Sequence, residues 1–453
     1  MSKSDSPTQS SSDSDVIQPE DAPIVDFSNE LRVFAEKLDG FARAMPAYIA
    51  AAHMIRVHAV KQIKDLAREH GSIAGEDDDS GSFSVTINAP AHGQWRRLHR
   101  EFQSASSLGD TLPELFIVSL ISQFDSYVGR LIRAGYLVQP KSIRASEKPL
   151  TVSDLLDLNS VDAAVEFVIE KEVESVLRKS HTDQFKWLED FLGIPLRRDL
   201  TVWADFIELT ERRNLFVHSG GIVSSQYLKI CGKNNADVDP DLKGTKLVVD
   251  RRYARKSYRV VREIGTKLGL VIWNKLQPEA GKQAGSFVTH EQVELLNLRE
   301  ADLAIELADF WDSLPIKERD AGTELYISIN KLIGLKQIGD DDSLRQGVAR
   351  IDWSTLAPKF LLAKACLEDD WDSAGRLMDR LSASKEMEPE QYQEWPIFDE
   401  FRKTDIFSKI YSSHYGEIIH KDFKTTLEGG VGDAMAKSKD VDNSSPPASR
   451  PHP

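Results

Sequence analysis

The segment RRNLFVHSGG, residues 212–221, contains residue types that are suited to chemistry on a phosphate. A guanidinium such as that of Arg213 forms charge-assisted hydrogen bonds to phosphate oxygens and stabilises negative charge in a transition state. An imidazole such as that of His218 exchanges protons near neutral pH, which suits general acid and base catalysis. The two residues together predict a site where a proton moves beside a phosphate.

The spacing of these residues sets a geometry. Apolar residues at helical spacing predict a helix over 201–219, and a glycine pair ends it. Asn214 and His218 are i and i+4 and share a face, whereas Arg213 and His218 are about 140° apart on an ideal helix. A second copy of the helix could therefore complete the group. A structural alternative is that the basic residues only stabilise the negative end of the helix dipole.

The run from Arg213 to His218 resembles the signature of the HEPN superfamily: Arg, a polar residue, a short apolar run and His near the end of a helix. Members of this superfamily are small all-helical bundles that usually dimerise, and many are metal-independent endoribonucleases. The resemblance implies attack of a ribose 2′-OH on the adjacent phosphate, which leaves a cyclic phosphate and a free 5′-OH. It implies that Arg213 holds the phosphate, His218 moves protons and Asn214 orients the site or contacts RNA. The Arg and His of two subunits would meet across the dimer seam.

A second segment adds to this resemblance. SLISQFDSYVGRLI, residues 119–132, is similar to the earlier HEPN helix that carries an acidic residue inside an apolar stretch. Asp125 takes that place, and its pairing with Arg213 would fix the direction of the arginine. The resemblance covers residues 113–276. An inactive HEPN scaffold that retains the motif is the alternative.

The elements that must position these residues are predicted to be helices almost throughout. The expected helices cover residues 29–45, 47–71, 92–106, 113–134, 160–180, 182–193, 201–219 and 250–275, and a lone strand covers residues 83–87. This pattern predicts an all-α, HEPN-like domain with an N-terminal helical extension over 27–283.

A Pro- and Gly-containing stretch, residues 276–286, is the predicted domain boundary. The helices over 287–425 resemble tetratricopeptide-like hairpins, in which small residues such as Ala365 and Ala374 let helices approach while Trp371 fills a groove. A nonrepeating helical bundle is the alternative. The polar, serine-rich ends, 1–26 and 426–453, predict disordered tails.

The segment from Asp250 to Glu263 is the most basic stretch of the chain. Its arginines follow i, i+3, i+7 and i+10, so a helix would place Arg252, Arg255, Arg259 and Arg262 on one face. Such a stripe attracts phosphates, which makes it the first candidate for RNA-backbone contacts. A second candidate is the pair Arg197 and Arg198. A solvated face paired with acidic neighbours is an equally simple interpretation.

Near the C-terminus, residues 395–411 contain five aromatic side chains, at 395, 398, 401, 407 and 411. Large aromatics mostly serve packing, so we expect a buried helical hairpin rather than a partner-binding groove.

Composition limits the function classes. The formal charge of -15 argues against a protein that coats nucleic acid or anionic membrane with its whole surface. Cys231 and Cys366 have no metal-ligand spacing, the histidines form no metal set, and no nucleotide-binding motif is present, so neither a metal nor a cofactor is expected. No stretch has the roughly 20 apolar residues of a membrane helix, and a cytoplasmic protein without a membrane partner is predicted.

The sequence is compatible with two functions. The first is a metal-independent endoribonuclease that acts as a homodimer on RNA, as a toxin or phage-defence effector, with a protein partner or regulator at the C-terminal helices. The second is a noncatalytic HEPN-type dimerisation module joined to a partner-binding helical scaffold.

Overall fold

The computed structural model describes residues 25–75, 83–140, 142, 150–151, 154, 157–158, 160–197 and 200–416. Most of these residues lie in α-helices, and the two strands are four residues long each. The predicted all-α fold is therefore confirmed. The predicted disordered tails lie outside the described residues, apart from residues 25 and 26, which precede the first helix.

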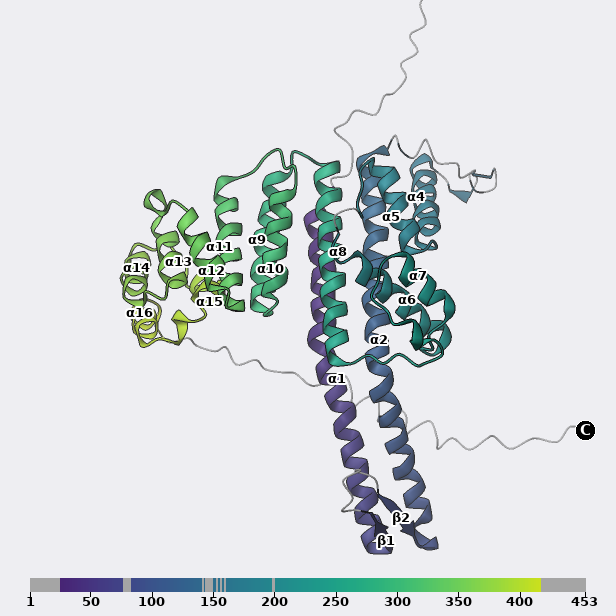
Figure 1. Cartoon of the computed structure of the whole chain (residues 1–453). Coiled ribbons are helices and arrows are strands. Elements are labelled where there is room, and N and C mark those ends of the chain that lie inside the picture. Colours follow the sequence, from purple (N-terminus) through teal and green to yellow (C-terminus); the bar gives the residue numbers. More distant parts are fainter. Residues whose placement is uncertain are drawn as a thin grey trace, which may run out of the picture. The chain divides into compact units, whose positions relative to one another are not determined.

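A long hairpin of two helices forms the spine of the first part of the chain (Figure 1). Its arms are α1 (Phe27–His70) and α2 (His92–Val138), which pack along each other. We predicted two shorter helices for each arm, but α1 continues through Pro46 and α2 through Pro113. An internal proline removes one helix hydrogen bond at a cost of about 3 kcal/mol. The contacts between the two arms offset this cost.

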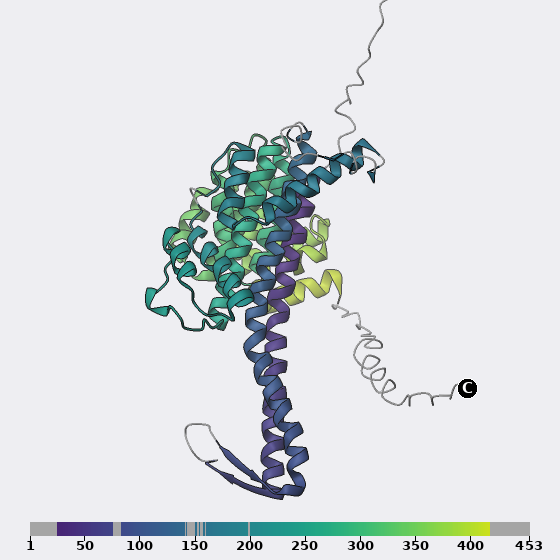
Figure 2. The same ribbon diagram turned by 90° about the vertical axis from the view of Figure 1, so that its right-hand side faces the viewer.

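A small sheet closes the far end of the hairpin (Figure 2). Strand β1 (Gly71–Ala74) pairs antiparallel with β2 (Ser84–Ile87), so the strand that we predicted to stand alone has a partner. Helix α1 ends at His70, one residue before the predicted end, and the close approach of the strands requires Gly71 to be glycine. A Cβ at Gly71 would lie 1.7 Å from the carbonyl oxygen of Thr86.

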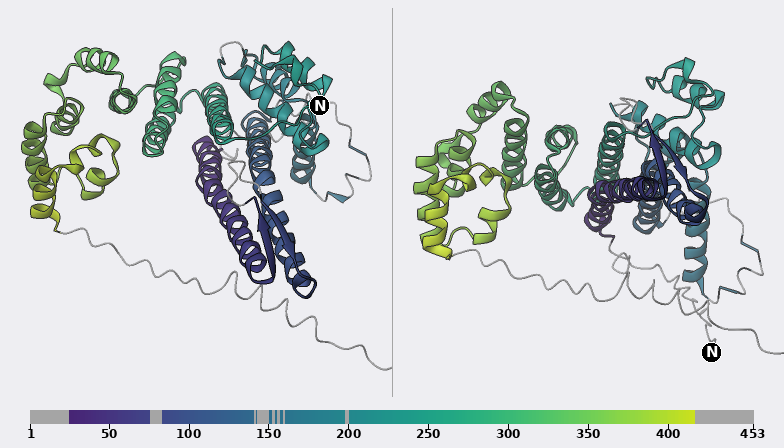
Figure 3. Two further views of the ribbon diagram at one scale, coloured as in Figure 1. Left: turned by 60° about the horizontal axis from the view of Figure 1, so that its bottom comes forward. Right: turned by 90° about the horizontal axis from the view of Figure 1, so that it is seen from below.

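Further helices of the described chain lie around the other end of the hairpin, as two more views show (Figure 3). They are α4 (Val161–Leu177), α5 (His181–Leu192), α6 (Trp203–Ser219), α7 (Ser225–Lys233) and α8 (Arg251–Leu276). The core between α2, α5 and α6 contains Phe124 of α2, whose ring centroid lies 4.8 Å from Phe206 of α6 and 6.4 Å from Phe185 of α5. This aromatic core fixes α5 and α6 against α2.

Helix α8 packs against both arms of the hairpin because two of its residues have no side chain. A Cβ at Gly265 would lie 2.2 Å from the Phe34 ring, and one at Gly269 would lie 2.0 Å from the Tyr127 hydroxyl oxygen. The glycines therefore set the distance between α8 and the hairpin.

The chain divides into two compact units, and the division falls after residue 351 rather than within 276–286. Residues 281–286 are the first turns of α9 (Gly281–Asn297). The two glycines in this segment serve packing instead of flexibility. A Cβ at Gly281 would lie 2.3 Å from a backbone oxygen, that of Glu318.

Paired helices complete both units. The first unit continues from α9 with α10 (Ala301–Ser313), α11 (Ala321–Ile338) and α12 (Asp341–Arg350). The second unit contains α13 (Pro358–Leu367), α14 (Trp371–Ser384), α15 (Pro389–Glu394) and α16 (Asp405–Tyr415). Ala365 of α13 and Ala374 of α14 are buried, and Trp371 stacks on Phe401 with ring centroids 5.7 Å apart. The likeness to tetratricopeptide hairpins stays a prediction.

The aromatic segment over 395–411 belongs to the core of the second unit. Phe398, Phe401, Phe407 and Tyr411 are all buried, which confirms the packing interpretation.

One described helical run, Ala89–Val138, is long and apolar enough by length and composition to cross a membrane. We predicted no such span from the sequence. Its most apolar window is 56 % buried inside the protein. Length and composition alone therefore do not distinguish this run from a core helix.

Candidate active site

The segment RRNLFVHSGG forms the C-terminal end of helix α6 and the glycine pair that follows it. The helix ends at Ser219, where Gly220 adopts the left-handed conformation with φ 56°, and Gly221 donates its N–H to the Leu215 carbonyl at 3.0 Å. Glycine is the residue that adopts this conformation at least cost. The predicted end of the helix is therefore present at the glycine pair.

The two adjacent arginines of α6 point to different partners. The Nε of Arg212 donates to a carboxylate oxygen of Glu208 at 2.7 Å, and its guanidinium lies 3.8 Å from the centre of the Tyr253 ring. Tyr227 and Tyr253 also donate their hydroxyls to Glu208. Burial beside this carboxylate raises the pKa of both tyrosines. Arg212 therefore belongs to a buried network that joins α6, α7 and α8.

Arg213 instead faces α2. Its Nη2 donates to Oδ2 of Asp125 at 2.9 Å, and its Nη1 donates to Oδ1 of Asn214 at 3.1 Å. The Arg213 side chain is 22 % exposed, and its buried Nε has no hydrogen-bond partner among the described residues. The pairing of Asp125 with Arg213 that we expected is present, so the carboxylate fixes the direction of the guanidinium.

Asn214 and His218 lie on one face of α6, but the structure does not join them. Asn214 is half-buried and accepts from Arg213, whereas His218 is exposed in the last turn. Within the described part of the chain, His218 has no hydrogen bond or ion pair. Its imidazole is therefore free to meet a substrate or a second subunit.

His181 is a site residue that we did not predict from the sequence. Its Nε2 lies 2.9 Å from Oδ1 of Asp125, and its side chain is 10 % exposed. The ring lies edge-on to Phe206, with the centroids 5.5 Å apart. We predicted that this helix begins at Thr182, but Ser180 caps it and His181 is its first residue. The serine was a usable local signal for the helix start, whereas the contact with Asp125 joins positions 56 residues apart.

Glu211 is a second carboxylate close to these groups. Burial raises its pKa, while the charge of His181 and a hydrogen bond with Asn214 act in the opposite direction. On a helix, Glu211, Asn214 and His218 follow i, i+3 and i+7 and so share one face. Three helices thus bring together two carboxylates, an arginine, an amide and a histidine.

Exposed apolar side chains lie in the last turn of α6 and in the segments that follow it. Val217 is 50 % exposed, Ile222 42 % and Val248 74 %. An isolated antiparallel bridge pairs Ile222 with Lys246, and Lys246 forms an ion pair of 3.1 Å with Glu114 of α2. The free His218 therefore lies in a segment that exposes apolar surface.

The predicted RNA-binding stripe on α8 is not a free basic face. Arg255 pairs with Glu300 at 3.0 Å, and Arg259 pairs with Asp302 at 2.8 Å. Arg252 is exposed and forms no ion pair with any described residue. The interpretation as paired surface charge therefore fits Arg255 and Arg259 better, although the acidic partners lie on α10 and just before it.

The prediction that Arg262 contacts RNA is wrong, because its side chain is only 2 % exposed and cannot contact RNA in this structure. It forms ion pairs of 2.7 Å with Asp39 of α1 and Glu291 of α9. Spacing alone placed it on the arginine face, but α1 and α9 cover that part of α8. Its role is to join three helices.

Of the second predicted pair, only Arg197 lies among the described residues, and it is not a free cation. Arg197 forms an ion pair of 2.6 Å with Glu189, and its guanidinium lies 5.8 Å from the centre of the Trp203 ring. Arg198 lies outside the described residues.

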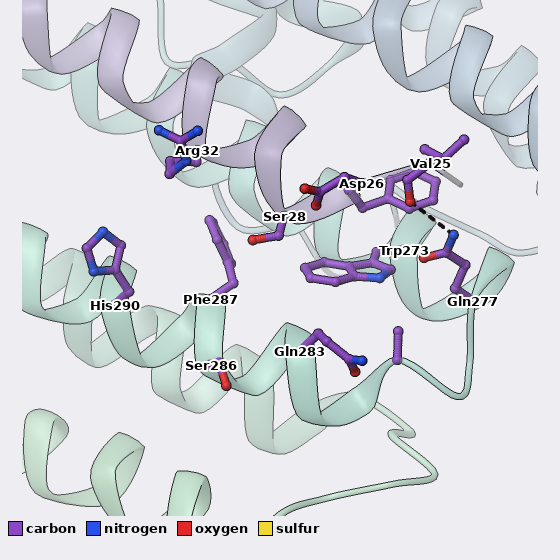
Figure 4. Close-up of a pocket in the computed structure, with 12 residues that line it drawn as sticks. Val25, Asp26, Ser28, Arg32, Trp273, Gln277, Gln283, Ser286, Phe287 and His290 are labelled. Atoms are coloured by element: carbon purple, nitrogen blue, oxygen red, sulfur yellow. Dashed lines mark hydrogen bonds between the residues drawn. The ribbon is translucent and has the colours of Figure 1, made fainter. Parts of the chain in front are cut away.

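A separate pocket of about 580 Å³ lies where α1 begins, α8 ends and α9 begins (Figure 4). Phe27, Trp273 and Phe287 form its aromatic walls, and Gln277 donates to the Val25 carbonyl at 3.2 Å. None of the predicted site residues lines this pocket.

The described residues contain no group of three or more His, Cys, Asp or Glu side chains placed to hold a metal ion. No protein-family model matches this chain, and no curated protein or solved structure shows a significant match to it. The resemblance to HEPN proteins therefore depends on the residues and geometry described above.

Proposed function

We propose that this protein is a metal-independent endoribonuclease of HEPN type that acts as a homodimer in the cytoplasm. The observation that supports the proposal best is the contrast between two residues of α6. Asp125 holds Arg213 in one direction at 2.9 Å, while His218 at the end of the same helix is exposed and uncommitted.

In the proposed reaction, Arg213 stabilises the negative charge that develops on the phosphate. His218 accepts the proton of the ribose 2′-OH as this oxygen attacks phosphorus, and the P–O5′ bond breaks. The leaving 5′ oxygen takes a proton from a second histidine. The products are a 2′,3′-cyclic phosphate and a free 5′-OH, and no water is consumed in this step.

The second histidine is proposed to come from a partner subunit. Arg213 and His218 are five residues apart, so an ideal helix separates them by about 140° and 7.5 Å along its axis. Within one subunit, Arg213 and His218 therefore point to different sides of α6. The exposed Val217 and Ile222 beside His218 suit a seam with a second copy, because burial of apolar surface drives association.

The C-terminal helices are proposed to bind a protein partner or to regulate the nuclease, and a role as a toxin or phage-defence effector follows from the HEPN resemblance. The cleaved RNA is proposed to lie across both copies of α6.

The test is cleavage of labelled RNA in EDTA by the wild type, Arg213→Ala, His218→Ala and an equimolar mixture of the two variants after subunit exchange. Each variant alone should lose cleavage by about 100-fold or more, as loss of a catalytic group generally costs. The mixture should recover little activity, because a mixed dimer contains one intact Arg213 but only one His218, and the proposed reaction uses a histidine from each subunit. Cleavage that persists in both single variants would exclude the assigned site.

The noncatalytic scaffold is the second candidate, and one observation favours it. Both terminal nitrogens of Arg213 already have acceptors within the protein, Asp125 and Asn214. If Arg213 has only a structural role, Arg213→Ala should lower stability and dimer affinity, and the wild type should not cleave RNA. Sedimentation velocity and thermal unfolding of the same variants measure these two quantities.

A further inference from the structure

Asp125 is held from two sides. Its Oδ2 accepts from Nη2 of Arg213, and its Oδ1 contacts Nε2 of His181, both at 2.9 Å. The three residues come from α2, α6 and α5. A carboxylate rotates broadly about its terminal torsion when it has a single partner. Two partners on its two oxygens define one orientation.

We infer that His181 is a positioning residue of the candidate active site, which acts on Arg213 through Asp125. The catalytic consequence rests on the proposed function, whereas the effect on Arg213 itself does not. An ionised aspartate can only accept hydrogen bonds. In the contact with Asp125, Nε2 of His181 therefore carries the hydrogen and donates it. His181 thereby fixes Asp125, and Asp125 fixes the guanidinium.

The surroundings of His181 explain how it keeps its place. The Ser180 side chain caps α5 at its first turn, and the rings of Phe124 and Phe206 pack near the imidazole, with centroids 6.3 and 5.5 Å away. A phenylalanine would satisfy this aromatic packing. Among the polar atoms described around the ring, Asp125 provides its one hydrogen-bond partner, and Glu211 of α6 is the second charged group that faces it.

A packing role and a positioning role predict opposite orders for two substitutions. His181→Phe keeps a ring of similar size between the phenylalanines but removes the donor. His181→Gln loses the ring but places an amide N–H near the position of Nε2. If His181 positions Asp125, the Gln variant should have a higher kcat than the Phe variant. If His181 only packs, the Phe variant should have the higher kcat.

The experiment measures kcat and KM for RNA cleavage, the melting temperature and the reaction of Arg213 with phenylglyoxal, read by mass spectrometry of the Arg213 peptide. We expect His181→Phe to lower kcat by about 10- to 100-fold with little change in KM, since small misplacements of catalytic groups cost this much. Arg213 should also react faster with phenylglyoxal. His181→Gln should have a kcat and a phenylglyoxal reactivity of Arg213 close to those of the wild type. His290→Phe, an exposed histidine on α9, is the matched control.

A double variant tests the route through Asp125. In an Asp125→Asn background, His181→Phe should add little further loss, because both changes break the same connection. Additive losses would overturn the inference, and so would a Phe variant with wild-type kcat and wild-type protection of Arg213. If His181→Phe melts below the assay temperature, the Gln variant decides: a Gln variant that folds but leaves Arg213 reactive contradicts positioning.

The two proposals fail in distinguishable ways. A wild type that cleaves no RNA removes the proposed function. The phenylglyoxal measurement still tests His181, because protection of Arg213 in the wild type and Gln variant, with exposure in the Phe variant, requires no catalysis.

Discussion

Nη2 of Arg213 lies 2.9 Å from Oδ2 of Asp125, although 88 residues separate the two in the chain. The pair is partly buried, and the other carboxylate oxygen is bound by His181. An arginine held in this way keeps one direction, which is the property that a phosphate-binding group needs before substrate arrives.

Replacement of Asp125 by Asn should lower RNA cleavage by about 10- to 100-fold, because the neutral amide no longer holds Arg213 by a charge-assisted bond. Initial cleavage rates measure the effect. Asp110→Asn, an exposed position on the same helix, is the control and should cleave like the wild type. A faster Asp125→Asn enzyme would mean that Asp125 restrains Arg213 from the substrate instead of orienting it.

The two neighbouring arginines of α6 should differ in their effect on stability. Arg212→Ala leaves Glu208 in a buried site without its cation, and removing one partner of a buried ion pair costs about 3–5 kcal/mol. The two tyrosine hydroxyls that also bind Glu208 should reduce this loss. Arg213→Ala should cost less, because Asp125 is more exposed and keeps its contact with His181. Urea unfolding measures the free energies, and an equal loss in both variants would contradict the separation of structural and functional roles.

Local signals predicted much of the fold. Helix α6 ends where the glycine pair predicts, and α8 begins at Arg251, within one residue of the predicted start at 250. The prolines at 46 and 113 were misleading because long-range packing between α1 and α2 overrides a local break. Strand β1 gave little sequence signal, since GSIA is short and exposed, and it forms only because β2 returns beside it.

The candidate site was predictable in part. The motif identified Arg213 and His218, and an acid inside an apolar helix identified Asp125. His181 could not be found by spacing, because its contact with Asp125 exists only after α5 packs on α2 through Phe124 and Phe185. The same limit explains the error at Arg262, since a sequence defines the faces of a helix but not which neighbours cover them.

The α8 arginines should differ in their contribution to RNA binding. Arg252 is exposed without an ion pair to any described residue, whereas Asp302 and Glu300 neutralise Arg259. In a His218→Ala background, Arg252→Ala should weaken RNA affinity and reduce the slope of log affinity against log salt by about 1, and Arg259→Ala should change neither strongly. Fluorescence anisotropy at several salt concentrations measures both quantities. Equal effects of the two variants would remove Arg252 as a preferred RNA contact.

Glu211 should make the stability of the protein fall as pH rises. Burial raises the pKa of Glu211 above its ordinary value of 4.5, although the charge of His181 and the Asn214 hydrogen bond oppose the shift. Between the unfolded and the folded pKa, the native state binds more protons than the unfolded state, so the free energy of unfolding decreases with increasing pH. The favourable contribution of the protonated carboxyl is complete below the unfolded pKa and is lost as pH rises through the folded pKa.

Glu211→Gln keeps the shape of the protonated carboxyl and cannot ionise. The free energy of unfolding of this variant, minus that of the wild type, should therefore increase from about pH 4.5 upward and level off above the folded pKa, since each group contributes only where the two states bind protons differently. Urea unfolding at a series of pH values gives this difference, in which the titration of all other carboxyls cancels. A difference that declines with pH would mean that the native state stabilises the ionised form of Glu211. The carboxylate would then act as a fixed negative charge beside the cationic groups of the site.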